Sequence, residues 1–111
     1  MARRKTSQID SSKNLDADII DTFKSVNPQK IILFGSVARE EADRFSDIDL
    51  IIVYRTQKRF LDRLEELYRH WNIDRAVDIL AYTPEEYEVL LKESDFVREA
   101  VEKGRVIYED V

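Results

Sequence analysis

The sequence contains no cysteine, one histidine, two glycines and two prolines among its 111 residues. Without cysteine, the chain has no disulfide framework, no cysteine nucleophile and no thiolate metal site. A single histidine, His70, is too few for a histidine-based zinc cluster. These absences leave oxygen atoms as the ligands that a metal ion would find here.

Long apolar runs and a net positive charge are also absent. No stretch approaches the roughly 18 apolar residues of a membrane span and no apolar signal region opens the chain, so we expect a cytoplasmic protein without membrane contact. The 18 basic and 23 acidic residues give a formal charge of −5. Because binding to a phosphate backbone requires clustered Lys and Arg, this balance argues against a nucleic-acid partner. It leaves room for a small phosphate-bearing ligand held through a metal.

The composition, 43% hydrophobic and 37% charged, is that of one compact domain. Residues 1–14 are polar and lack periodicity, which predicts a flexible tail before a single domain at residues 15–111. Strands are predicted at residues 30–34, 47–54, 76–82 and 105–108. Helices are predicted at residues 15–26, 36–42 and 60–71, after Thr83 and after Ser94. This alternation predicts an α/β (α+β) fold with a small mixed sheet flanked by helices.

Two helix starts carry recognisable caps. Ser36 is the expected N-cap of the short helix at residues 36–42. Thr83, followed by Pro84 and by Glu86 three residues on, has the pattern of a capping box. The glutamates at residues 85–88 are interpreted as a solvated helix face.

The first candidate site element is the corner at Gly35-Ser36, where an apolar strand turns directly into a helix. Glycine lets the backbone approach a ligand closely, and Ser36 adds a hydroxyl donor beside the helix start. Such a corner suits a phosphate group. An ordinary strand–turn–helix with a serine cap is the alternative interpretation.

The second element is the pair Asp47 and Asp49, at the mouth of an apolar strand. Strand alternation sends both side chains to one face, roughly 6.5 to 7 Å apart. Two neighbouring carboxylates repel each other unless a cation neutralises them, and oxygen ligands favour Mg²⁺ or Mn²⁺. Alternatively, Asp47 belongs to a turn and Asp49 merely lies at a strand edge.

The third element is Asp78, an acid inside the apolar segment Val77-Asp78-Ile79-Leu80. If this strand lies beside that of Asp49, the three carboxylates converge at one end of the sheet. Such a triad can hold two divalent ions for in-line attack at phosphorus, and Asp78 can accept a proton from the nucleophile. A salt bridge to Arg75 is the structural alternative for Asp78.

Together, Gly35-Ser36, the Asp-x-Asp pair after ten intervening residues, and the later Asp78 resemble the nucleotidyltransferase superfamily typified by DNA polymerase beta. The segments GSVAR and SDIDL are similar to its small bacterial and archaeal branch, the minimal nucleotidyltransferases or MNT domains. The resemblance runs from about Leu15 to Tyr108. Members of that branch are often paired with helical HEPN proteins.

The resemblance implies a role for each candidate residue. Asp47 and Asp49 would bind both of two Mg²⁺ or Mn²⁺ ions, and Asp78 would complete the catalytic metal site. Gly35 and Ser36 would hold the triphosphate of ATP, and attack at its α-phosphate would release pyrophosphate. Arg39 would stabilise phosphate charge; a surface ion pair with Asp43 is the alternative.

The resemblance also implies a function: transfer of a nucleotide, AMP from ATP, to a hydroxyl on an acceptor. The acceptor expected is a tyrosine of a HEPN-type toxin, which makes the chain an antitoxin. The alternative is a catalytically weak or inactive nucleotide-binding module that neutralises its partner by covering it. Glu40-Glu41 favour the alternative, because family members usually have a small residue directly after the arginine. A homo-oligomer is compatible with either function.

Overall fold

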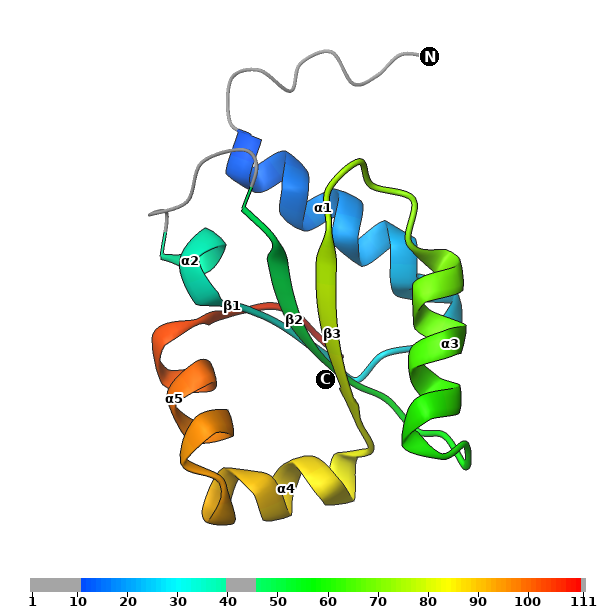
Figure 1. Ribbon diagram of the computed structural model, residues 1–111, viewed down its shortest axis with the longest axis vertical. Coiled ribbons are helices and arrows are strands. Elements are labelled where there is room, and N and C mark those ends of the chain that lie inside the picture. Colours follow the sequence, from blue (N-terminus) through cyan, green and yellow to red (C-terminus); the bar gives the residue numbers. More distant parts are fainter. Residues whose placement is uncertain (1–10, 40–45, 111) are drawn as a thin grey trace.

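The computed structural model describes residues 11–39 and 46–110 of the chain, and the side chains from residue 15 onward. Figure 1 shows a twisted sheet with helices against both of its faces. The helices are α1 (Ser11–Phe23), α2 (Gly35–Ala38), α3 (Phe60–His70), α4 (Pro84–Glu93) and α5 (Asp95–Lys103), and a 3₁₀ turn, Lys24–Val26, follows α1. The strands are β1 (Lys30–Phe34), β2 (Ile48–Val53), β3 (Val77–Tyr82) and β4 (Arg105–Glu109).

The four strands form one mixed sheet in the order β3-β2-β1-β4. β1 pairs antiparallel with both β2 and β4, whereas β2 and β3 run parallel. A parallel pair needs a long crossover connection, and α3 supplies it between β2 and β3. The predicted mixed α/β fold is therefore confirmed.

The core has two layers because successive strand residues point to opposite faces of the sheet. On one face, Ile48, Leu50 and Ile52 of β2 pack in a cluster with buried residues of α1 and α3. On the other face, Ile51 and Val53 pack in a cluster with buried residues of α4 and α5. The same alternation places Asp49 on the face of α4 and α5.

The short helix differs from its prediction. α2 spans only Gly35–Ala38 within the described residues, and Phe34 rather than Ser36 precedes it as N-cap, without a side-chain hydrogen bond. The chain turns one residue early because Gly35 adopts a left-handed φ of 77°. Ser36 therefore lies inside the helix and is not its cap. Residues 40–42 of the predicted helix lie outside the described residues.

Most other boundaries follow the sequence closely, but the start of α1 does not. α1 begins at Ser11, so residues 11–14 of the predicted tail are helical, and residues 1–10 of that tail lie outside the described residues. Thr83 Oγ1 accepts a hydrogen bond from the Glu86 amide at 3.2 Å, and Glu86 Oε1 accepts one from the Thr83 amide at 3.0 Å, which confirms the capping box. Within the described ranges, no helix is long and apolar enough to cross a membrane.

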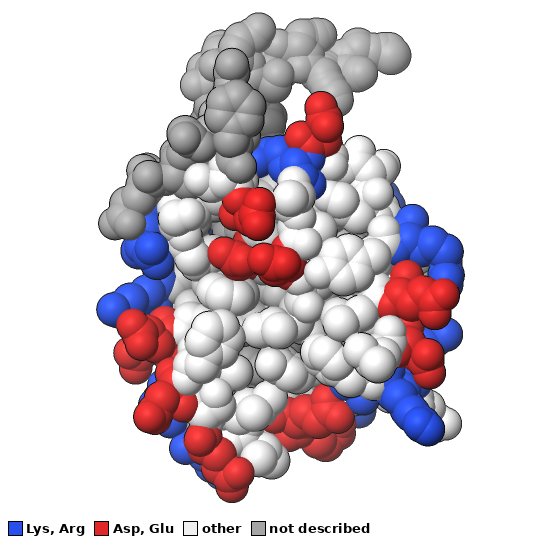
Figure 2. Space-filling model, viewed as in Figure 1, with Lys and Arg blue, Asp and Glu red and all other residues white. Residues whose placement is uncertain are grey.

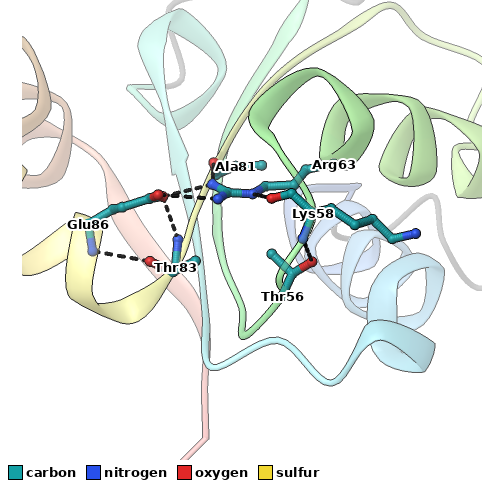
Figure 3. A network of polar contacts seen from close by, with 6 residues as sticks. All are labelled: Thr56, Lys58, Arg63, Ala81, Thr83 and Glu86. Carbon is teal, nitrogen blue, oxygen red and sulfur yellow. Dashed lines mark hydrogen bonds and ion pairs between the residues drawn. The ribbon is translucent and has the colours of Figure 1, made fainter.

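The glutamates of the run at residues 85–88 are exposed, as predicted, but Glu86 also forms a specific ion pair. Its carboxylate accepts two hydrogen bonds from the guanidinium of Arg63, at 2.7 and 3.2 Å, and Arg63 is only 7% exposed (Figure 3). The same guanidinium donates to the carbonyl of Ala81 in β3 at 3.1 Å. This ion pair joins α3 to α4 through β3, so Glu86 is part of the structural framework.

Candidate active site

The end of β1 brings a glycine against an aspartate. Phe34 pairs with Asp49 in the antiparallel register, and Gly35 is the next residue along the chain. A Cβ atom placed on Gly35 would lie 2.3 Å from Asp49 Oδ2, which is far inside contact distance. Only glycine suits this position, because a left-handed φ and a carboxylate against Cα both exclude a side chain.

The parallel pairing of β2 and β3 brings two further acids together. Asp49 and Asp78 are direct partners in the register, so both side chains project from the same face of the sheet. Asp47 lies two residues before Asp49, just ahead of β2, and is exposed. Figure 2 shows acidic groups among largely uncharged residues where Figure 1 draws the beginnings of β2 and β3. From the sequence, the three acids were expected to converge if the strand of Asp78 lay beside that of Asp49. β3 does lie beside β2, so this condition is met.

Hydrogen bonds fix the start of these strands. The Ile48 amide donates to the Ala76 carbonyl at 2.9 Å, and Arg75 Nη2 donates to the Ser46 carbonyl at 2.9 Å. On the outer side of β3, the Ile79 amide donates to the hydroxyl of Tyr68 at 3.1 Å. Arg75 thus anchors the segment that precedes Asp47, a role different from the salt bridge to Asp78 considered from the sequence.

The pKa of Asp49 is raised above its usual range. Burial of the carboxyl is the largest cause, followed by repulsion from Asp78 and then from Asp47. The carboxyl groups of Asp78 and Asp47 thus lie close enough to Asp49 to oppose its ionisation. A cation beside them would remove this repulsion.

The donor set fits a divalent cation in its chemistry, because carboxylate oxygens are the ligands that Mg²⁺ and Mn²⁺ prefer. Across the part of the chain that the structure describes, no three acidic, histidine or cysteine side chains are already gathered at ligand spacing. Asp49 and Asp78 are paired on adjacent strands and Asp47 lies two residues before Asp49, so these three residues are the candidates to hold such an ion.

The candidate nucleotide-binding residues lie on and just after α2. Gly35 and Ser36 are partly buried, and Arg39 is exposed at the C-cap of the helix. Arg105 of β4 holds this helix in place: its guanidinium donates to the Ala38 carbonyl at 3.5 Å and pairs with Asp16 of α1 at 2.9 and 3.1 Å. Asp43, the alternative partner for Arg39, and Glu40-Glu41 lie outside the described residues.

Sequence reasoning did not single out the residues of α5 that line a cavity of about 300 Å³ beside Gly35. Phe96, Glu99 and Lys103 of α5 line this cavity together with Arg39. Their i,i+3 and i,i+4 spacing shows that these three share one helix face. The local sequence pattern does not show which element this face contacts, because that depends on how α5 packs in the fold.

The sequence profile of the family described as "Polymerase beta, Nucleotidyltransferase" matches residues 17–110. The chain belongs to this nucleotidyltransferase family. The match covers β1, α2, β2 and β3, and therefore all of the residues described above as candidate site. A search of curated proteins found no match.

Two solved structures resemble this nucleotidyltransferase domain. One is a crystal structure of a toxin–antitoxin with AMP-PNP, with a TM-score of 0.58 and 22% identity over 86% of this chain and 73% of that one. The other is a putative nucleotidyltransferase from Sulfolobus solfataricus, with a TM-score of 0.56 and 20% identity over 98% of this chain and 92% of that one. At these identities, the likeness establishes the shared fold.

Proposed function

We propose that this domain transfers AMP from ATP to a hydroxyl group in a reaction that depends on Mg²⁺ or Mn²⁺. The observation that carries the proposal is the in-register pairing of Asp49 with Asp78 on adjacent strands, next to Gly35 and two residues after Asp47. Membership of the nucleotidyltransferase family supports it. Nucleotidyl transfer needs this combination, because the acids hold cations where a phosphate chain can approach the backbone.

In this proposal each residue has a defined task. Asp47 and Asp49 bind both ions, and Asp78 completes one of the two sites. The ions, when bound, offset phosphate charge and make the acceptor hydroxyl more acidic. Gly35 and Ser36 hold the triphosphate, and Arg39 stabilises its negative charge.

The chemical step is a substitution at the α-phosphorus of ATP. The acceptor oxygen forms a new bond to this phosphorus while the bond between the α-phosphorus and its bridging oxygen to the β-phosphate breaks. Pyrophosphate leaves with the bonding electron pair. The hydroxyl proton passes to Asp78, the acid on the edge strand β3, which acts as general base.

We further propose that the acceptor is a tyrosine of a HEPN-type toxin, so that the domain acts as an antitoxin. Support comes from the shared fold with the toxin–antitoxin that was crystallised with AMP-PNP. A second function is a nucleotide-binding antitoxin that sequesters its partner with little turnover. Glu40-Glu41 favour this second function, since family members usually have a small residue directly after the arginine.

Transfer of label separates the two functions. The domain is incubated with α-³²P-labelled ATP, Mg²⁺ and the product of the adjacent gene, and label on that partner is measured. Asp47→Asn should abolish labelling, whereas Asp18→Asn, which removes the same charge from an exposed position on α1, should leave it unchanged. Neutralisation of the partner that survives Asp47→Asn combined with Asp49→Asn would establish sequestration instead.

A further inference from the structure

Gly35 borders two different environments. Asp49 lies against its Cα atom, and the cavity of about 300 Å³ described above opens beside the same residue. The lining of this cavity includes the aromatic rings of Phe34 and Phe96 but none of the three aspartates. Gly35 is therefore a residue that the carboxylate of Asp49 and the cavity both border.

Among the residues that the structure describes, the lining of the cavity carries two cations, Arg39 and Lys103, and one anion, Glu99, whereas the whole chain carries −5. Lys103 Nζ donates to Glu99 Oε2 at 2.9 Å. This hydrogen bond lowers the pKa of Glu99, with further lowering from the charges of Lys103 and Arg39. The Glu99 carboxylate thus lies in the field of both cations, where an external anion would bind.

Aromatic side chains form the wall of this cavity. Phe34 and Phe96 meet edge to face with centroids 5.9 Å apart, and Phe96 remains 58% exposed. The cavity thus combines an apolar wall with charged side chains that remain exposed to solvent, Lys103 at 62% and Glu99 at 64%. A volume of about 300 Å³ is at the small end of ligand sites and suits part of a ligand rather than a whole nucleotide.

From this arrangement we infer that the cavity receives the terminal phosphates of the triphosphate. Lys103 is a phosphate-binding residue that acts beside Arg39, and Glu99 is an internal anion that competes with the phosphates for Lys103. The inference rests on the proposed function, because it takes the α-phosphate to lie at the three aspartates. Glu99 keeps Lys103 in place without ligand and weakens triphosphate binding.

Affinity for two ligands tests the inference. α,β-Methylene-ATP carries the terminal phosphates and is not cleaved at the reacting bond, whereas AMP lacks them. Both are titrated calorimetrically in Mg²⁺ against the full chain. Lys103→Ala should weaken the binding of the triphosphate about fivefold and leave AMP within about twofold. Glu99→Gln should tighten the binding of the triphosphate about threefold, since the competing charge is gone.

The ion pair Glu65–Arg69 provides matched controls. It has the same i,i+4 spacing on α3, is similarly exposed, and does not line the cavity. Glu65→Gln and Arg69→Ala should each change triphosphate affinity less than twofold, which excludes a general effect of net charge.

The possible outcomes distinguish failure of this inference from failure of the proposed function. If the wild-type protein binds the triphosphate and Lys103→Ala binds it equally well, the inference is wrong and the proposed function stands. If Lys103→Ala and Glu99→Gln shift affinity as expected but the wild-type protein transfers no label, the inference stands and the proposed transfer is wrong. No binding of the triphosphate by the wild-type protein overturns both.

Discussion

Gly35 leaves no space for a side chain beside Asp49, so a substitution at Gly35 tests this contact. We expect Gly35→Ala to lower the free energy of unfolding by about 2 kcal/mol, because the new Cβ meets Asp49 Oδ2 and the φ of 77° is strained for alanine. Urea denaturation followed by circular dichroism measures this change.

A double-mutant cycle separates the two causes of that loss. Asp49→Ala removes the carboxylate that the new Cβ would meet, so Gly35→Ala in that background should cost only about 1 kcal/mol, the cost of the backbone conformation. An equal cost in both backgrounds would show that the contact with Asp49 contributes nothing.

Asp49 itself is expected to reduce the stability of the metal-free fold. Its raised pKa means that the folded state holds the proton more tightly than the unfolded chain, so ionisation at pH 7 opposes folding. Asp49→Asn should therefore raise the free energy of unfolding in EDTA, by less than about 1 kcal/mol because the side chain is partly solvated. A loss of stability in urea denaturation would contradict this account.

At the scale of the elements, the ion pair Arg63–Glu86 joins α3 to α4, and its contribution to stability can be tested. Arg63 lowers the pKa of Glu86, so the stabilisation is present above the unfolded pKa of the carboxyl and is lost as pH falls through the folded value. Glu86→Gln should lower the free energy of unfolding by about 1 kcal/mol at pH 7 and change it little at pH 3. Denaturation midpoints at both pH values measure the effect.

Glu85 is the matched control for this prediction. It is the neighbouring residue of α4 and also pairs with an arginine, Arg55, but both side chains are more than 70% exposed. Exposed ion pairs contribute little, so Glu85→Gln should have a much smaller effect than Glu86→Gln at pH 7. If both substitutions lower the free energy of unfolding equally, the stabilisation comes from the start of α4 and not from the Arg63–Glu86 ion pair.

Most elements could be predicted from the sequence because their signals are local. The apolar run at 30–34 gives β1 with its observed bounds, and the cap at Thr83 forms as its spacing predicts. Two features were not predicted. α2 starts one residue early because of the left-handed φ of Gly35, a conformation that glycine permits but does not require. Glu86 pairs with Arg63, 23 residues away, and no window of sequence around Glu86 contains that information.

At the scale of the whole molecule, the acids and the cavity differ in how far the sequence reveals them. Strand alternation and an unusual acid in each apolar strand predicted that Asp49 and Asp78 would converge only if their strands were neighbours. The parallel pairing of β2 and β3 meets that condition. The cavity depends on how α5 packs against α2, which no periodicity in the sequence specifies. Local patterns thus identify the acids, whereas strand pairing and helix packing bring the parts of the candidate site together.

Ligand binding should stabilise the whole domain, since a ligand that binds only the folded state adds its binding energy to folding. With Mg²⁺ and α,β-methylene-ATP at about ten times its dissociation constant, the gain is about 1.4 kcal/mol, or an increase of roughly 5–10 °C in Tm for a domain of this size. The proposed role of the acids requires this shift to vanish in EDTA and in Asp47→Asn, and to persist in Asp18→Asn. Thermal denaturation measures each case. A shift that persists in Asp47→Asn would place the nucleotide away from the carboxylates, and the pairing of Asp49 with Asp78 would then serve no catalytic purpose.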